Sequence, residues 1–301
     1  MQTREAIRTR DEQKISATVY QSQGENDKVV VIGPSARATQ SLYKPMATYL
    51  AQQGITAVTF DYRGTGGSLF GKSKKRKCTL QQWASLDLDA VLLYVKNHFP
   101  GRELIFIGHG ISGELAGLAP ASQYINRLVL INASLSCAGL WPWDGRLRLS
   151  LAKLFIPVRN ILFRLLPGRT RFSINSLPPG VMKEWSNWCN NNNGLFDVFP
   201  DNNYRKLQVS LLAFSFTDDW RSPSKAVAAL LKHYSGATTT WHHAKPGDFG
   251  LLKMGHNGFF EQKSRHILWD KLILWFDDRL KEEEQEAISS STYFYSKTQR
   301  P

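Results

Sequence analysis

Residues 104–113, LIFIGHGISG, form the first stretch of the sequence whose residue types and spacing could do chemistry. A short apolar run ends at Gly108 in a cluster of small residues, and the pattern that follows, residues 114–119, is typical of a helix. The stretch therefore predicts a strand, a sharp turn and a helix. Such a turn holds its central residue in a strained conformation and leaves room only for small neighbours. It is a place where a nucleophilic side chain can be exposed to a substrate.

The residue at the centre of this turn is Gly110, which carries no nucleophile. The pattern of a nucleophile elbow is G-x-S-x-G, and this chain reads Gly108-His109-Gly110-Ile111-Ser112. Acyl-enzyme chemistry through residue 110 is therefore excluded unless a serine is supplied from elsewhere. Since no activated serine stands at the elbow, a fluorophosphonate probe is not expected to label the protein.

Ser112 is the alternative nucleophile within the same stretch. It falls on the first turn of the predicted helix, where a serine more readily satisfies the helix N-terminus or packs against a neighbouring strand. Shifting the frame to Ser112 also places Glu114 where a small residue is needed. A structural role is favoured for Ser112.

The elements that must position this turn alternate along the chain. Strands are expected at residues 15–20, 29–33, 55–60, 104–108, 127–132, 208–215 and 238–244, and helices at 41–53, 80–98, 223–234 and 263–280. Strands that alternate with helices at this spacing predict an α/β fold with a doubly wound, mostly parallel sheet.

The alternation breaks between residues 134 and 204, which include Trp141 and Trp185. We interpret this segment as a helical insertion that divides the core into residues 1–133 and 205–280. Residues 281–301 are charged and rich in serine and threonine, a composition typical of a disordered tail.

Composition narrows the classes of function. The 301 residues are 42% apolar, enough for one large core, and include three cysteines without metal-ligand spacing. These features favour a reduced, cytoplasmic protein without a metal or organic cofactor. No secretory signal is visible, and no apolar run is long enough to span a membrane.

The net charge of +13 allows acidic partners, yet no nucleic-acid-binding motif accompanies it. A specific nucleic-acid partner is therefore not expected. Weak contact with a membrane surface or an acidic partner stays open for two basic stretches, residues 72–77 and 147–166, although the second favours an ordinary cap over a pocket.

Four motifs in order resemble the α/β-hydrolase superfamily over about residues 29–280. They are DYRGTGGS (61–68), the elbow frame, FSFTDDWRSP (214–223) and MGHNGFF (254–260). More narrowly, PSARATQSLY (34–43) and LPPGVMKEWSNWC (177–189) are similar to a bacterial family of largely uncharacterised hydrolases related to serine aminopeptidases and esterases. The resemblance implies an α/β-hydrolase fold in which residues 134–204 form a cap.

The resemblance also implies roles for individual residues. His256 would be the catalytic base and Asp219 the acid that orients it, with Asp218 as a rival for that role. The N–H groups of Ala36 and Ile111 would form the oxyanion hole.

Further positions are candidates for contact with a small substrate. Arg37 stands where the family pattern has glycine, and its guanidinium could bind a carboxylate or phosphate. The candidates for substrate binding are Arg37, Ser112, Trp141 and Trp185.

Two kinds of function fit these residues. In the first, His256 with Asp219 acts as a general base on an ester, thioester or amide of an apolar or acyl-type molecule, in a pocket that Gly110 enlarges. Elimination, isomerisation or cyclisation would suit the same pair. In the second, the protein is an inactive relative that binds a ligand or partner. A third possibility is that Gly110 is an altered residue in an ordinary serine hydrolase.

Overall fold

The computed structural model describes residues 1–24, 27–69, 78–147 and 177–278. The basic loop at 72–77, residues 148–166 of the second basic stretch and the tail after residue 280 lie outside the described residues.

An eight-stranded sheet runs through the molecule in the order β1-β2-β4-β3-β5-β6-β7-β8. Its strands are β1 (Gln2–Arg8), β2 (Lys14–Tyr20), β3 (Lys28–Gly33), β4 (Thr56–Phe60), β5 (Glu103–His109), β6 (Arg127–Ile131), β7 (Ser210–Phe216) and β8 (Thr238–Ala244). The β1–β2 and β2–β4 pairs are antiparallel, and all other pairs are parallel. The predicted mostly parallel, doubly wound sheet is confirmed.

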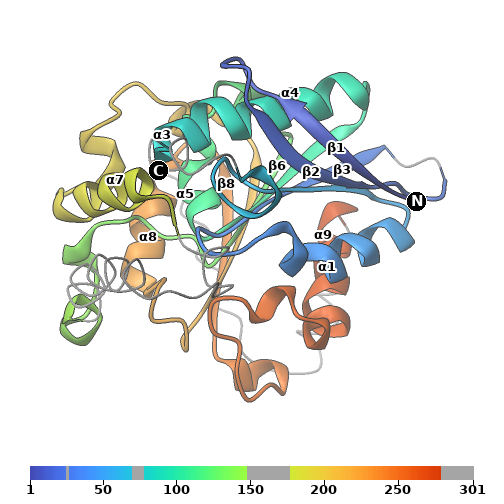
Figure 1. Ribbon diagram of the computed structural model, residues 1–301. Coiled ribbons are helices and arrows are strands. Elements are labelled where there is room, and N and C mark those ends of the chain that lie inside the picture. The colour runs from blue at the N-terminus through green and yellow to red at the C-terminus, as the bar shows by residue number, and fades with distance from the viewer. Residues whose placement is uncertain (25–26, 70–77, 148–176, 279–301) are drawn as a thin grey trace, which may run out of the picture.

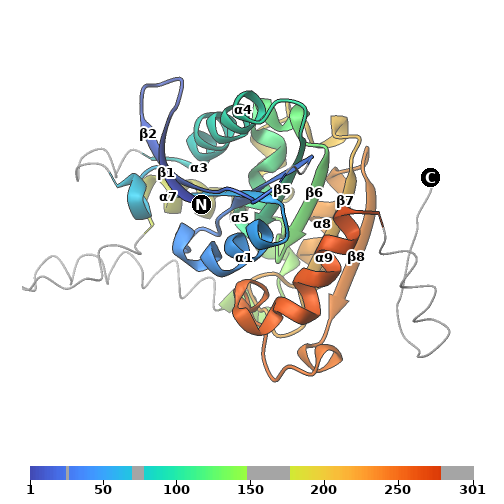
Figure 2. The same cartoon turned by 90° about the vertical axis from the view of Figure 1, so that its right-hand side faces the viewer.

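Helices cover both faces of this sheet (Figures 1 and 2). The α-helices are α1 (Gln40–Gln52), α3 (Leu80–Gln82), α4 (Asp89–His98), α5 (Ile111–Leu115), α7 (Pro179–Asn190), α8 (Ser224–His233) and α9 (Asp270–Phe276). Two π-helical stretches, η2 (Trp83–Leu88) and η12 (Arg265–Trp269), lead into α4 and α9. Short 3₁₀ turns are η1 (Gly66–Ser68), η3 (Ala116–Leu118), η4 (Pro120–Tyr124), η5 (Ala138–Leu140), η7 (Gly194–Asp197), η8 (Tyr204–Lys206), η9 (Pro246–Phe249), η10 (Gly258–Phe260) and η11 (Gln262–Ser264).

The core is divided by the sheet into two layers. On one face α1 and α9 bury side chains such as Met46 and Leu272 against the sheet. On the other face α4, α5 and α8 bury Val91, Leu115 and Leu230. Helices on both faces cover the apolar runs of the central parallel strands, as a doubly wound sheet requires.

The strand β1 was not expected from the sequence. Within β1 only Ile7 is fully buried, and the strand lies at the edge of the sheet, paired along its whole length with β2. Since its sequence carries little apolar alternation, pairing with β2 rather than local pattern determines its conformation.

Two predicted helices are less regular than expected. The helix at 80–98 contains η2, and the helix at 263–280 becomes regular only at Asp270 and ends at Phe276. Just beyond, Asp278 has a φ of 59°, a left-handed conformation that cannot continue a helix.

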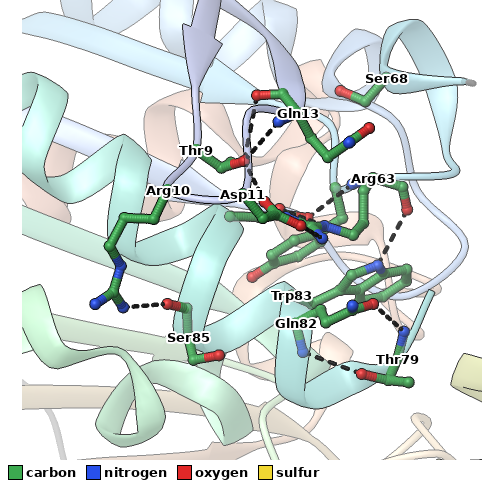
Figure 3. Close-up of polar contacts among 12 residues, drawn as sticks. Thr9, Arg10, Asp11, Gln13, Arg63, Ser68, Thr79, Gln82, Trp83 and Ser85 are labelled. Atoms are coloured by element: carbon green, nitrogen blue, oxygen red, sulfur yellow. Dashed lines mark hydrogen bonds and ion pairs between the residues drawn. The ribbon is translucent and has the colours of Figure 1, made fainter.

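Ionic contacts of the buried Arg63 side chain fasten the β1–β2 turn to the rest of the fold (Figure 3). Arg63, only 3% exposed, donates through Nε to Asp87 Oδ1 at 2.7 Å and through Nη1 to Asp11 Oδ2 at 2.7 Å. Asp11 lies in the β1–β2 turn, and Trp83 Nε1 donates to the Arg63 carbonyl at 3.1 Å. The motif at 61–68 is therefore a structural junction.

The same motif fixes the start of α1. The Asp61 carboxylate accepts from the backbone N–H groups of Gln40 and Gly67, each at 2.8 Å. At Gly66, with a φ of +43°, an added Cβ would come within 2.3 Å of that carboxylate. Only glycine fits there.

In the described part of the segment between β6 and β7 lie the helix α7 and the short turns η5, η7 and η8. Helix α7 contacts α3, where the Glu184 carboxylate accepts from the N–H groups of Leu80 at 2.5 Å and Gln81 at 3.2 Å. These bonds cap α3 and tie the insertion to the core. Among the residues that the structure describes, no helix is long and apolar enough to cross a membrane.

Candidate active site

Gly110 forms the sharp turn between β5 and α5 that the sequence predicts. Its φ of 53° and ψ of −117° are strained for any residue with a side chain. A Cβ at this position would lie 2.9 Å from His256 Nε2 and 2.9 Å from Ser35 Oγ. The side chains of His256 and Ser35 therefore border the space beside Gly110.

His256 and Asp219 form a hydrogen-bonded pair at this turn. His256 Nδ1 lies 2.7 Å from Asp219 Oδ2, and their side chains are 11% and 1% exposed. Since an ionised carboxylate can only accept, Nδ1 carries a proton, and in the corresponding neutral tautomer Nε2 presents its lone pair. The pair is thus arranged as a base and the carboxylate that orients it.

Asp218 has a different contact. Its Oδ2 accepts from the N–H groups of Met254 and Gly255, each at 2.9 Å. The rival carboxylate therefore holds the loop that carries His256, and the structure places it on backbone rather than on the imidazole.

Ser35 is the site residue that sequence reasoning missed. Its Oγ lies 3.0 Å from His256 Nε2, and the residue is 8% exposed. The signal was its place directly before Ala36, in the loop after β3. In this loop the resemblance points to the Ala36 N–H, and charge points to the Arg37 guanidinium, but neither singles out the Ser35 hydroxyl.

The loop of Ser35 is fixed by the core around it. The Ser35 N–H donates to Tyr43 Oη at 2.8 Å, and Ser112 Oγ donates to the Pro34 carbonyl at 2.6 Å. Ser112 is fully buried, with Tyr62 Oη 2.8 Å from its hydroxyl. The expectation that Ser112 binds substrate is therefore wrong, because its hydroxyl is enclosed and anchors this loop.

His109 links the Ser35 loop to the His256 loop. Its Nε2 lies 2.9 Å from the His256 carbonyl, which can only accept, so Nε2 carries the proton. Its Nδ1 then accepts from Tyr43 Oη at 2.7 Å. Burial lowers the pKa of His109 well below its usual value, which keeps the ring neutral as this arrangement requires.

Asn132 gives a second support to the His256 backbone. Its Nδ2 donates to the His256 carbonyl at 2.9 Å and to the Gly255 carbonyl at 3.1 Å. Asn132 directly follows β6 and has a φ of 49°. Neighbouring strand ends therefore hold the base in place.

The remaining predicted residues lie in different environments. Ala36 is half-buried, Ile111 is 8% exposed and Arg37 is exposed. Trp185 is half-buried and donates to Ser136 Oγ at 3.1 Å. Trp141 is 5% exposed, and its indole N–H donates to the Trp220 carbonyl.

No group of histidine, cysteine, aspartate and glutamate side chains in the described part of the chain could hold a metal ion. The three cysteines, Cys78, Cys137 and Cys189, are buried and not disulfide-bonded.

Comparisons with known proteins agree with this architecture. A family model described as serine aminopeptidase, S33, matches residues 24–176, which is half of the chain. No curated protein matches the sequence.

Solved structures of several hydrolases share the fold. An esterase from Exiguobacterium antarcticum aligns with a TM-score of 0.61 and 15% identity over 91% of this chain and 99% of its own. A soluble variant of monoglyceride lipase from Saccharomyces cerevisiae, in complex with a substrate analogue, aligns with a TM-score of 0.63 and 14% identity over 92% and 95%. DcsB in complex with its substrate analogue gives a TM-score of 0.59 and 17% identity over 93% and 100%. At these identities the likeness is one of the α/β-hydrolase fold.

Proposed function

Because the chain belongs to the serine aminopeptidase S33 family of α/β-hydrolases, we propose that it hydrolyses an ester, thioester or amide of a small apolar or acyl-type molecule. His256 is the general base of this reaction and Asp219 orients it. The observation that carries the proposal is the 2.7 Å bond between Asp219 Oδ2 and His256 Nδ1, beside the turn at Gly110.

The protonation of the pair suits this role. Nδ1–H is donated to a carboxylate that is almost fully buried, which leaves the Nε2 lone pair to remove a proton. A general base so placed contributes roughly 10²–10⁴-fold to a rate. The N–H groups of Ala36 and Ile111 remain the proposed donors to the oxyanion, and residues 134–204 the proposed cap.

The fold neighbours support an acyl bond as the target. The names of the esterase and the monoglyceride lipase indicate that they act on esters, and both proteins share this chain's fold. In this proposal Arg37 and Trp185 are the residues that select the substrate, through charge and apolar contact.

Hydrolysis of a panel of p-nitrophenyl esters, acyl thioesters and amino-acid anilides tests the proposal. Asp219→Asn should lower kcat by about 10³–10⁴-fold, because the amide no longer fixes the tautomer of His256. Asp218→Asn is the matched control and should keep most of the rate, since an amide oxygen can still accept from Met254 and Gly255. Equal rates for Asp219→Asn and the wild-type protein would contradict the proposal.

A second pair of variants separates the base from other histidines. His256→Ala should abolish turnover, whereas His266→Ala, whose side chain is 78% exposed, should not change it. If the wild-type protein hydrolyses no member of the panel, the binding or non-hydrolytic function would be favoured instead.

A further inference from the structure

We propose that Ser35 is the catalytic nucleophile, supplied by the loop after β3 in place of a serine at the elbow. The inference rests on the proposed hydrolase function and deepens it by naming the atom that attacks the substrate. It replaces the expectation that an activated serine is absent.

A chain of hydrogen bonds joins Asp219, His256 and Ser35. Asp219 Oδ2 lies 2.7 Å from His256 Nδ1, and His256 Nε2 lies 3.0 Å from Ser35 Oγ. Because Nδ1 carries the ring proton, Nε2 must accept, so the Ser35 hydroxyl is the donor. This is the geometry in which an imidazole activates a serine.

Ser35 and Gly110 lie so close together that a side chain at position 110 would compete with that of Ser35 for the same space. A Cβ on Gly110 would lie 2.9 Å from Ser35 Oγ, closer than such atoms normally approach. An elbow serine and the Ser35 hydroxyl therefore exclude each other in this arrangement. The absence of a side chain at 110 leaves room for the Ser35 hydroxyl beside His256.

The loop that carries Ser35 is held in place by hydrogen bonds and close packing. Its backbone is bonded on both sides, by Tyr43 Oη at the Ser35 N–H and by the Ala38 N–H at the Ser35 carbonyl, 2.9 Å away. At Gly33 an added Cβ would lie 2.7 Å from Phe106 and Ser112 side-chain atoms, so the loop is also packed closely at its start. A nucleophile fixed in this way loses little entropy on attack.

The reaction then proceeds in two balanced halves. Ser35 Oγ attacks the acyl carbonyl carbon while its proton passes to His256 Nε2. The bond to the leaving alcohol, thiol or amine breaks, and His256 returns the proton to that group, which leaves an acyl ester on Ser35. Water, deprotonated by His256, attacks this ester. The bond to Ser35 Oγ breaks, and the serine recovers its proton as the carboxylic acid departs.

Labelling with a fluorophosphonate probe, located by tandem mass spectrometry, tests the proposal. Wild-type protein should be labelled at Ser35, and labelling should disappear in Ser35→Ala and fall sharply in His256→Ala. Ser41→Ala, which replaces an exposed serine six positions further along the chain, is the control and should be labelled at Ser35 as the wild-type protein is. Labelling at Ser112 or another serine would overturn the proposal.

Hydrolysis by the same variants separates this inference from the function it rests on. Ser35→Ala should lose at least about 10³-fold in kcat, as expected for a missing nucleophile. If His256→Ala is inactive but folded Ser35→Ala keeps its rate, water is the nucleophile and only the inference fails. If His256→Ala also keeps its rate, the proposed function fails.

A thiol at position 35 gives a readout that does not depend on the substrate. The introduced thiol of Ser35→Cys should react with iodoacetamide much faster than an ordinary exposed thiol, since His256 would stabilise the thiolate. The three native cysteines are buried and should react slowly. The rate should fall when His256→Ala is added, and an unchanged rate in that double variant would contradict activation by His256.

Discussion

Ser35 and Gly110 together make up one catalytic position. Gly110 stands out in the sequence as a departure from the elbow pattern, whereas Ser35 does not, because a serine in a loop has many structural uses. Their relation becomes visible only in space, where a Cβ at 110 and the Ser35 hydroxyl would lie 2.9 Å apart. The proposed role of Ser35 therefore depends on a contact between residues that lie 75 positions apart in the sequence.

Moving the hydroxyl back to the elbow is the test at the residue scale. Gly110→Ser alone should lower both kcat/KM and Tm, because the new side chain collides with Ser35 Oγ and His256 and the backbone strain costs about 1–3 kcal/mol. Ser35→Ala with Gly110→Ser should recover at least about tenfold over Ser35→Ala alone, since a hydroxyl again faces His256. A Gly110→Ser protein with unchanged rate and Tm would show that the two side chains do not compete.

The pairing of His256 with Asp219 could be predicted from sequence, and the contact of His256 with Ser35 could not. His256 and Asp219 stand in motifs whose order and spacing are diagnostic of the superfamily. Ser35 lies within the stretch at 34–43 that carries the narrower family resemblance, but that resemblance gives its hydroxyl no role. The structural role of Ser112 follows from its place in the elbow, whereas the burial of Trp141 does not follow from local pattern.

At the scale of elements, strand ends and turns rather than helices position the site. The His256 carbonyl accepts from His109 at the end of β5 and from Asn132 at the end of β6. Asp218, after β7, holds the backbone just before His256. Since the carboxyl ends of neighbouring parallel strands meet at one edge of the sheet, these contacts come from the topology itself.

The junction around Arg63 should be a large contributor to the stability of the fold. Arg63→Met should lower the free energy of unfolding by about 3–5 kcal/mol, because it leaves the fully buried Asp87 carboxylate without its cation. Arg8→Met removes the ion pair of Arg8 with Glu12, whose side chains are 63% and 68% exposed. This change should alter the free energy of unfolding by about 1 kcal/mol or less. Urea unfolding measures the free energy of unfolding of both variants. An equally small change in Arg63→Met and Arg8→Met would contradict the role given to Arg63.

The sequence predicts the helices and strands whose apolar periodicity is strong. It does not predict a strand whose conformation is set by pairing with its neighbour. The central parallel strands are apolar along their length and were placed from sequence to within a few residues. The edge strand β1 is mostly exposed and could not be found by pattern. The π-helical stretches η2 and η12 likewise have no sequence periodicity of their own.

At the scale of the whole molecule, the turn at Gly110 is coupled to the insertion through a buried acid. Glu114, in α5, accepts from the Ser136 N–H at 2.5 Å and from Ser136 Oγ at 2.6 Å. The residue is 1% exposed, and burial raises the pKa of its carboxyl to about 7. The start of the insertion is thereby fastened to the helix that follows the elbow.

This carboxyl should make stability depend on pH. Its folded pKa of about 7 lies above the ordinary value of 4.5, so the folded state binds the proton more tightly than the unfolded state. The stabilisation is complete below about pH 4.5 and is lost as the pH rises through about 7, on the order of 3 kcal/mol in all.

Calorimetry of Glu114→Gln at pH 5 and pH 8 checks this dependence. The fall in Tm between the two pH values should be smaller in Glu114→Gln than in the wild-type protein, since the amide does not ionise. The exposed Glu261→Gln is the control and should keep the wild-type fall. An undiminished fall in Glu114→Gln would assign the dependence to other groups.

The most direct test of the central claim is a crystal structure of the protein after reaction with a fluorophosphonate. The account predicts continuous electron density from Ser35 Oγ to phosphorus, with His256 Nε2 beside the adduct and a phosphoryl oxygen facing the N–H groups of Ala36 and Ile111. An adduct on any other serine, with the Ser35 hydroxyl still bonded to His256, would contradict it.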